Sequence, residues 1–161
     1  QHVFGWIENA TLEPWGVKVK SKLDTGALTS SLHARNIERF EKDGEEWVRF
    51  EVNVEDQDED EKVSRKFERP LYRDVIIRGA GGEERRPVVL MEICFGDTVH
   101  EEQFSLENRS DMIYPVLIGR RTIQHLGVVD VTNTFMHEPQ CDEDSPVEKF
   151  DKDNTDEDVG V

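Results

Sequence analysis

One carboxylate of the chain stands in a setting that suits acid–base chemistry. Asp24 is followed directly by Thr25 and Gly26, and it comes after an alternating apolar run at 17–23. Because this alternation is typical of a half-buried strand, Asp24 is expected where a strand ends in a tight turn. The glycine lets backbone approach closely there, and the threonine hydroxyl can bond to another strand. A carboxylate held in this way can activate water, whereas the three residues without further support are usually only a turn.

Other chemistries find less support in the sequence. The histidines are scattered and include no His-Glu-x-x-His pattern, and no pair of Cys or His has the spacing of a metal site. Residues 79–82, Gly-Ala-Gly-Gly, lack the lysine and the following helix of a phosphate-binding loop. No serine or cysteine lies in a nucleophile elbow. We therefore expect no metal site and no cofactor.

The elements that must position Asp24 are short strands. Apolar runs bounded by turn signals predict strands at 17–23, 47–54, 75–77, 87–95, 99–106 and 114–118. Helical signals are limited to 121–126, which Gly127 stops, and to one or two turns within 31–39. Many short strands with little helix predict an all-β domain, built as a barrel or a sandwich.

Length and charge limit the class of protein. The 161 residues carry a formal net charge of −16, which argues against nucleic acid and anionic membranes as partners. No apolar run approaches the roughly 20 residues that a membrane-spanning helix needs. We expect one domain at 3–137 and an acidic tail at 138–161, whose composition predicts disorder. A second acidic run at 55–61 is expected at an exposed hairpin tip.

Two further features bear on the cellular compartment. Cys94 lies in an apolar run and Cys141 in the acidic tail, and a disulfide between them stays open because no framework pattern supports it. The chain begins with Gln1 rather than Met, which indicates either a processed or a trimmed form and slightly favours an extracytoplasmic, periplasmic location over a cytoplasmic one.

Several motifs, in their order and spacing, resemble the retropepsin family of single-domain aspartic peptidases. Residues 24–27, Asp-Thr-Gly-Ala, match the family's active-site signature. Residues 77–82, Ile-Arg-Gly-Ala-Gly-Gly, resemble its glycine-rich flap, and 89–94 resemble the strand after the flap. Val-Leu-Ile-Gly-Arg at 116–120 is similar to the strand that packs behind the catalytic loop and leads into the terminal helix. The resemblance covers residues 16–135.

A closer resemblance is to the bacterial branch of this family that is labelled ATP-dependent zinc protease. Its Asp-Thr-Gly-Ala-x-Thr-Ser-x-Leu-His-Ala block stands complete at 24–34. Its Glu-Arg-Arg-Pro-Val and Arg-Ser-Asp-Met-x-Tyr-Pro-Val-Leu-x-Gly-Arg-Arg stretches stand at 84–88 and 109–121. Because so little of a zinc site is present, a zinc-dependent peptidase is kept as a lesser alternative.

The resemblance implies an enzyme that acts as a two-fold homodimer. Aspartic peptidase chemistry needs two carboxylates that share a proton, and this chain has one Asp-Thr-Gly. A second copy of Asp24 across the dimer axis would complete the dyad. The implied fold is a closed β-barrel with a flap hairpin and one short helix near its end. The predicted catalytic residues are Asp24, Thr25 and Gly26, and the predicted substrate-binding residues are Ala27, Arg78, Gly79, Ala80, Gly81, Gly82 and Arg120.

One departure from the family concerns specificity. Leu28 stands where retroviral members carry an acidic partner for the Gly-Arg arginine, so Arg120 must pair elsewhere or face the substrate. The arginines near the flap and the Gly-Arg segment could bind acidic or glutamate-rich peptides, or could equally balance local acids. The former fits the association of this branch with ATP-grasp glutamate ligases. The main alternative is a non-catalytic peptide-binding module of the same fold.

Overall fold

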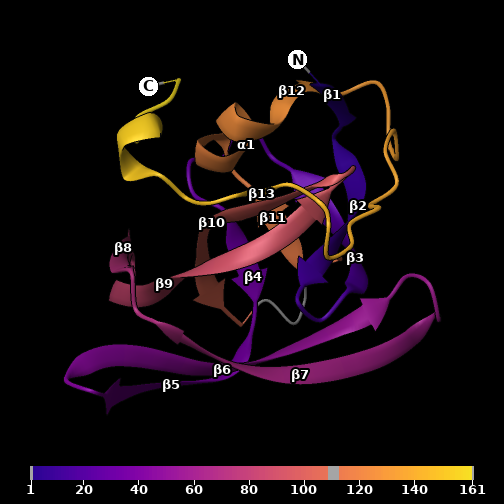
Figure 1. Ribbon diagram of the computed structural model, residues 1–161. Coiled ribbons are helices and arrows are strands. Elements are labelled where there is room, and N and C mark those ends of the chain that lie inside the picture. Colours follow the sequence, from indigo (N-terminus) through magenta and orange to yellow (C-terminus); the bar gives the residue numbers. More distant parts are fainter. Residues whose placement is uncertain (1, 109–112, 161) are drawn as a thin grey trace.

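The computed structural model describes residues 2–108 and 113–160, and strands dominate it (Figure 1). The elements in this part of the chain are β1 (His2–Gly5), β2 (Ile7–Glu13), β3 (Val17–Leu23), β4 (Ser31–His33), β5 (Arg35–Lys42), β6 (Glu45–Asp56), β7 (Glu61–Pro70), β8 (Arg73–Gly79), β9 (Gly82–Phe95), β10 (Thr98–Glu107), β11 (Val116–Ile118), α1 (Arg120–Leu126), β12 (Gly127–Asp130), β13 (Val147–Glu148) and the 3₁₀ helix η1 (Lys152–Asn154). The predicted all-β class with a short helix near its end is confirmed. The first four residues of the motif at 109–121 lie outside the described residues.

Strands of the main sheet close into a ring. Their order is β10, β4, β11, β3, β2 and β9, and β9 pairs again with β10. β8 is added to β9, and β13 is added to β10. Buried and half-exposed residues alternate along β3, so this strand has the predicted period of two. The largest buried side chains of the ring include Leu12, Leu32, Met91, Ile93 and Phe104.

A three-stranded sheet, β5–β6–β7, lies beneath the ring in Figure 1. The long strand β6 buries alternate apolar side chains, which are Val48, Phe50, Val52 and Val54. The ring of Phe67 from β7 stacks on that of Phe50, with centroids 5.6 Å apart. The acidic run at 55–61 spans the β6–β7 turn, so the prediction of a hairpin tip is confirmed.

The prediction of helical turns within 31–39 is wrong, because two strands occupy this segment. β4 pairs in parallel with β10 and antiparallel with β11, and all three of its residues are buried. β5 pairs with β6. Since β4 joins β10 to β11 in the ring, tertiary pairing decides its conformation over local preference.

The strand and helix that pack behind the Asp24 motif begin close to the positions predicted for them. β11 begins at Val116, two residues later than expected, and α1 begins at Arg120, one residue earlier. Gly127 ends α1 with a φ of +149°, and a Cβ there would collide with the backbone carbonyl of His2. Only glycine adopts this conformation without strain, so the helix stop is built into the sequence.

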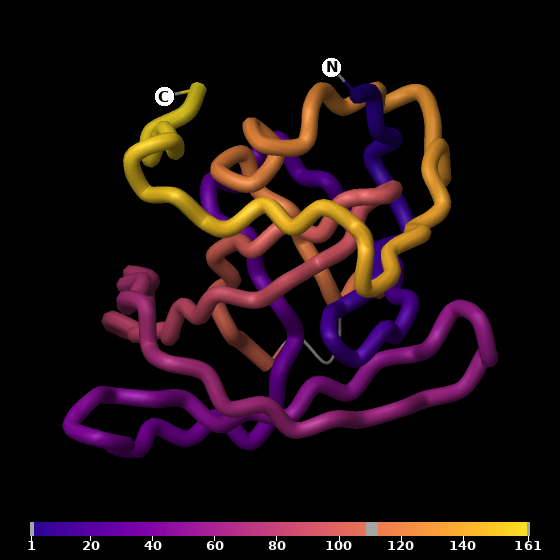
Figure 2. The backbone as a smooth tube through the Cα atoms, in the orientation of Figure 1, coloured from indigo at the N-terminus to yellow at the C-terminus, as the bar shows by residue number. Residues whose placement is uncertain are grey.

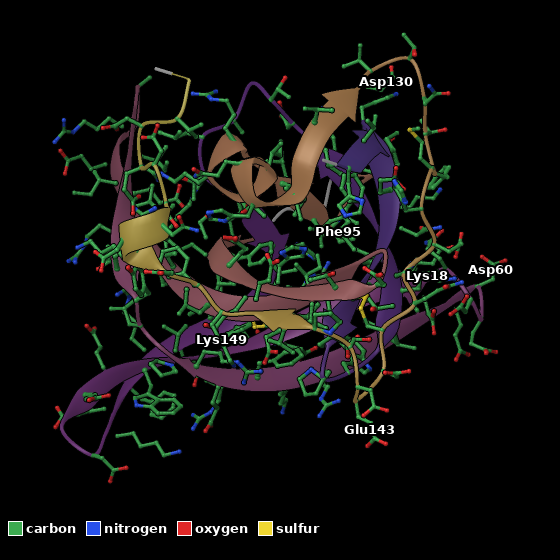
Figure 3. The ribbon with its side chains drawn as sticks, turned by 45° about the horizontal axis from the view of Figure 1, so that its top comes forward. Lys18, Asp60, Phe95, Asp130, Glu143 and Lys149 are labelled. Carbon is green, nitrogen blue, oxygen red and sulfur yellow. A yellow bond between two sulfur atoms is a disulfide. The ribbon has the colours of Figure 1, made fainter. Side chains whose placement is uncertain are left out.

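Residues 138–160 follow a defined path, which differs from the disorder that their composition predicts. Figure 2 shows this segment crossing the ring and ending near α1. A disulfide joins Cys141 to Cys94 of β9. Lys18 lies between the β6–β7 tip and the start of the segment (Figure 3), and its Nζ is 2.9 Å from Glu138 Oε2. These tethers supply contacts that composition does not reveal. The domain boundary at residue 137 stays a prediction.

Candidate active site

Asp24 lies where β3 leaves the ring. β3 runs parallel to β11, with Leu23 beside Ile118. The backbone N–H of Asp24 donates to the Ile118 carbonyl at 2.8 Å, and that of Leu23 donates to the Trp6 carbonyl at 2.8 Å. The backbone that carries the carboxylate is therefore fixed by strands on both sides.

The Asp-Thr-Gly turn closes on itself directly after β3. The backbone N–H of Gly26 donates to Asp24 Oδ1 at 2.9 Å, and that of Ala27 donates to the Asp24 carbonyl at 3.2 Å. A Cβ on Gly26 would lie 3.1 Å from the same Oδ1, so glycine leaves the room that the carboxylate uses. Thr25 and Gly26 are exposed, and Asp24 is partly exposed. The turn is rigid and open to contact from outside.

The residues after the turn are held by the β11–α1 connection. The backbone N–H of Arg120 donates to the Ala27 carbonyl at 2.8 Å, and Gly119 N–H donates to Ser30 Oγ at 3.0 Å. Ser30 Oγ also lies 2.7 Å from Thr122 Oγ1 in a buried hydroxyl pair. Sequence reasoning missed Ser30 and Thr122 as support residues. The position of Ser30 within the 24–34 block could have pointed to a supporting role. Its partner Thr122, however, is 92 positions away in the sequence.

Arg120 finds its partners elsewhere, since Leu28 cannot supply an acidic one. Its Nη1 donates to the Thr25 carbonyl at 3.0 Å, and its Nε donates to the Val159 carbonyl at 2.8 Å. Backbone carbonyls thus replace the acidic side chain that retroviral members carry. Through the first of these bonds, a predicted substrate-binding residue braces the Asp24 turn itself.

The predicted flap is the β8–β9 hairpin. Gly79 pairs with Gly82 across a two-residue turn, and Gly82 has a φ of +108°. The tip residues Ala80 and Gly81 are exposed. Within residues 2–108 and 113–160, this tip makes no hydrogen bond or ion pair with Asp24. The structure thus groups Asp24–Ala27 with Arg120 and leaves the flap separate.

The flap arginines pair with nearby acids. Arg78 Nε lies 3.0 Å from Glu83 Oε1, and Arg85 Nη2 lies 2.7 Å from Asp74 Oδ2. Asp74 also accepts from Arg39, and this bond, followed by that of Arg85, lowers the pKa of the Asp74 carboxyl. Local charge balance therefore accounts for Arg78 and Arg85 in the single chain.

An acid–histidine cluster, in which Glu102 and His100 are buried, lies on the side of α1 that faces β10. His125 Nδ1 contacts Glu102 Oε1, and the hydrogen bond raises the pKa of His125. Burial raises the pKa of Glu102, although the same bond acts in the opposite direction. Burial lowers the pKa of His100, whose Nδ1 lies 3.3 Å from Glu148 Oε2. Sequence reasoning missed this cluster, because its members come from β10, α1 and β13.

Two other kinds of feature are a metal centre and a membrane-spanning helix. Within residues 2–108 and 113–160, no group of three or more His, Cys, Asp or Glu side chains is arranged to hold a metal ion. In the same ranges, no helix has the length and apolar character needed to cross a membrane.

A strand-end Asp-Thr-Gly turn, backed by a parallel strand and a short helix within a ring of strands, defines the retropepsin-like class. The family described as "Retropepsin-like aspartic endopeptidase RimB" (RimB-like) matches residues 3–140. The chain belongs to this family. The resemblance to retropepsin-like peptidases found in the sequence is therefore confirmed as family membership.

Individual relatives show how far the similarity extends. A "Probable alpha-L-glutamate ligase" of Shewanella pealeana is 34% identical over 118 residues, which make up 73% of this chain and 25% of that protein. One of the same name from Desulfotalea psychrophila is 35% identical over 113 residues, 70% of this chain and 24% of that protein. The chain thus spans about a quarter of the length of these curated relatives. The crystal structure of Lpg0085 from Legionella pneumophila, titled as a protein of unknown function, is 35% identical with a TM-score of 0.72, covering 86% of this chain and 99% of that one.

Proposed function

We propose that the chain is an aspartic endopeptidase that acts as a homodimer, with Asp24 of each copy forming the catalytic dyad. The intact Asp24-Thr25-Gly26 turn carries this proposal: it is braced from behind by β11 and Arg120, and it leaves Thr25 and Gly26 exposed. A two-fold contact between copies needs such a rigid, accessible turn in order to bring two carboxylates together. A module that only binds peptides has no need of the carboxylate.

The chemistry requires one proton on the dyad at the start. The ionised carboxylate accepts a proton from the attacking water, and the protonated carboxylate gives its proton to the scissile carbonyl oxygen. The water oxygen bonds to the carbonyl carbon and forms a neutral gem-diol. Collapse of the gem-diol breaks the C–N bond. The carboxyl that took the water proton gives it to the leaving amine, and the other carboxylate takes a proton from a gem-diol hydroxyl, which restores the starting dyad. We expect the β8–β9 hairpin to close over the peptide and exclude bulk water.

The proposed substrate class is acidic, glutamate-rich peptide. The relatives named as glutamate ligases and the cationic Arg120 beside the turn support this choice. The pairing of Arg78 and Arg85 with local acids limits their part in it, unless the substrate displaces those acids. Ligation itself is not proposed for this chain, because it spans only about a quarter of the length of the relatives named as ligases.

The decisive experiment compares cleavage by the wild type and by Asp24→Asn. A peptide library that includes glutamate-rich sequences is incubated with each protein, and cut sites are found by mass spectrometry. Loss of one acid–base group is expected to lower the rate by about 10²–10⁴-fold. Asp43→Asn is the matched control, because Asp43 is exposed in the β5–β6 turn at a φ of +53° that Asn also tolerates.

Each outcome of this comparison bears on one candidate function. Cleavage that survives Asp24→Asn and stops with a chelator would contradict the aspartic mechanism and favour a zinc-dependent peptidase. Preferred cleavage of neutral over acidic peptides would contradict the substrate class alone. Binding without cleavage by wild type and Asp24→Asn alike would favour the peptide-binding module.

A further inference from the structure

The outer face of α1 carries the C-terminal segment of the same chain. Figure 1 shows the yellow end of the chain beside α1, and residues 154–159 make the contacts. Along this segment Thr155, Glu157 and Val159 are half-buried, whereas the residues between them are exposed. The alternation indicates that one side of the segment lies against a surface, while residues 157–160 form a turn.

The contacts are made mainly to the backbone of the segment. Gln124 Nε2 donates to the Asp156 carbonyl at 3.0 Å, and Gln124 Oε1 accepts from the Asp156 N–H at 3.0 Å. One amide side chain thus hydrogen-bonds both the N–H and the carbonyl of Asp156, as the backbone of a neighbouring strand would. Arg121 Nε donates to the Glu157 carbonyl at 2.7 Å, and Arg120 Nε donates to the Val159 carbonyl at 2.8 Å.

The same surface is also selective for negative charge. Glu157 Oε2 lies 3.2 Å from Arg121 Nε. Arg73 of β8 interacts electrostatically with both Arg121, which repels it, and Glu157, which attracts it. Arg73 Nη2 is buried without a hydrogen-bond partner. A glutamate at this position of a bound peptide therefore pairs with Arg121 and lies within electrostatic reach of Arg73.

The surface is connected to the catalytic turn through one side chain. Arg120 bonds the Thr25 carbonyl through Nη1 and the Val159 carbonyl through Nε. Gly160 lies so close that a Cβ on it would be 3.0 Å from Arg120 Nε. Whatever occupies the surface therefore shares its arginine with the Asp24 turn.

We propose that the face of α1 formed by Arg120, Arg121 and Gln124 is a docking surface for acidic peptide. In this chain residues 154–159 occupy it in cis and compete with acidic peptides that arrive in trans. The segment is tethered by the Cys94–Cys141 disulfide and by β13, which keeps its local concentration high. Docking stands on the contacts above, whereas any effect on cleavage rests on the proposed peptidase activity.

Hydrogen exchange in the full chain tests docking in cis. Gln124→Ala removes both bonds to Asp156, so the Asp156 amide is expected to exchange roughly tenfold faster than in the wild type. Glu157→Ala and Asp158→Ala remove the same charge at adjacent positions, but only Glu157 contacts Arg121. Faster exchange of residues 154–159 is expected for Glu157→Ala and not for Asp158→Ala. Equal exchange in wild type and Gln124→Ala would overturn the proposal.

Fluorescence anisotropy tests docking in trans, with a labelled peptide of residues 153–160 as the probe. The receptor is the full chain with residues 154–159 replaced by Gly-Ser repeats, which leaves α1 and the disulfide unchanged. The peptide is expected to bind this variant at least about tenfold more tightly than the wild type, whose surface is occupied. Adding Gln124→Ala to the variant should remove the gain. Equal binding to all three proteins would overturn the proposal.

Cleavage assays separate this inference from the proposed activity. The Gly-Ser variant is expected to have a lower KM than the wild type for acidic peptides. If neither protein cleaves any peptide, the proposed activity fails, while exchange and anisotropy still decide whether the surface docks peptide. If both cleave with the same KM, docking does not compete with substrate, and the competitive part of the proposal is wrong.

Discussion

At the scale of single residues, Gly119 shows why the motif behind Asp24 tolerates little change. Its φ of −92° is open to any residue, so the constraint is steric rather than conformational. A Cβ there would lie 2.8 Å from the Leu28 carbonyl oxygen and 2.8 Å from Thr29 C. Both contacts are with backbone, which cannot move aside without shifting the segment that follows the Asp24 turn.

Gly119→Ala is therefore expected to lower the free energy of unfolding by about 1–3 kcal/mol. Gly81→Ala in the flap tip is the control, because a Cβ there meets no atom within 4 Å. Urea denaturation followed by circular dichroism measures both. Equal stability of Gly119→Ala and the wild type would mean that the Leu28–Thr29 backbone relaxes freely.

The His125–Glu102 pair predicts how stability depends on pH. His125 has a raised pKa in the folded state, so its stabilising contribution is present below about pH 6.5 and is lost as pH rises through the folded pKa. The raised pKa of Glu102 acts in the same direction, because the folded state again binds more protons. His100, with its lowered pKa, acts in the opposite direction.

We expect His125→Gln to reduce the fall in unfolding free energy on going from pH 6 to pH 9. The measurement is a series of urea titrations across that range. His100→Gln serves for comparison, since it should remove the opposing contribution and steepen the fall. An unchanged pH profile in His125→Gln would show that the histidine binds protons equally in the folded and unfolded chain.

At the scale of elements, local patterns predicted the strands that alternate and missed the contacts that join distant segments. β3 and the β9–β10 hairpin could be predicted from the sequence because their periodicity and turn residues are local. β4 was not, since its three buried residues gain their conformation from pairing with β10 and β11. For the site, the same holds: the Asp24 turn is a local motif, whereas the Ser30–Thr122 pair needs the fold.

The link between β9 and the acidic segment gives an element-scale prediction. The Cys94–Cys141 disulfide closes a loop over 47 positions, and removing such a crosslink costs about 2–4 kcal/mol of stability. Cys94→Ala is expected to cost more than Cys141→Ala, because Cys94 is also a buried core residue. Thermal unfolding of both variants, and of the wild type with and without reductant, measures the difference. A reductant without effect on the Tm would contradict the disulfide's role.

At the scale of the whole molecule, the proposed homodimer must form between two strongly acidic chains. Each copy carries a net charge of −16, so long-range repulsion opposes association. Salt screens this repulsion, since the Debye length falls from about 30 Å at 0.01 M to about 10 Å at 0.1 M. The dimer Kd is expected to fall severalfold over this range.

Sedimentation velocity at both ionic strengths measures that change directly. Specific peptidase activity should rise with salt and with protein concentration over the same range, since the single chain carries half a dyad. Tighter association at low salt would mean that complementary charges across the interface outweigh the net repulsion. Activity that does not depend on protein concentration would contradict the need for a dimer.

The position of β8 at the end of the main sheet's strand order has a consequence for colloidal stability. The strand leaves Ile76 50% and Ile77 38% exposed, and an edge strand offers backbone groups to any neighbouring chain. Repulsion between net charges opposes such edge contacts at neutral pH, but the net charge vanishes near the sequence pI of about 4.6. The protein is therefore expected to aggregate edge to edge in that range. An activity lost in acid should thus be checked by light scattering before it is assigned to the titration of Asp24.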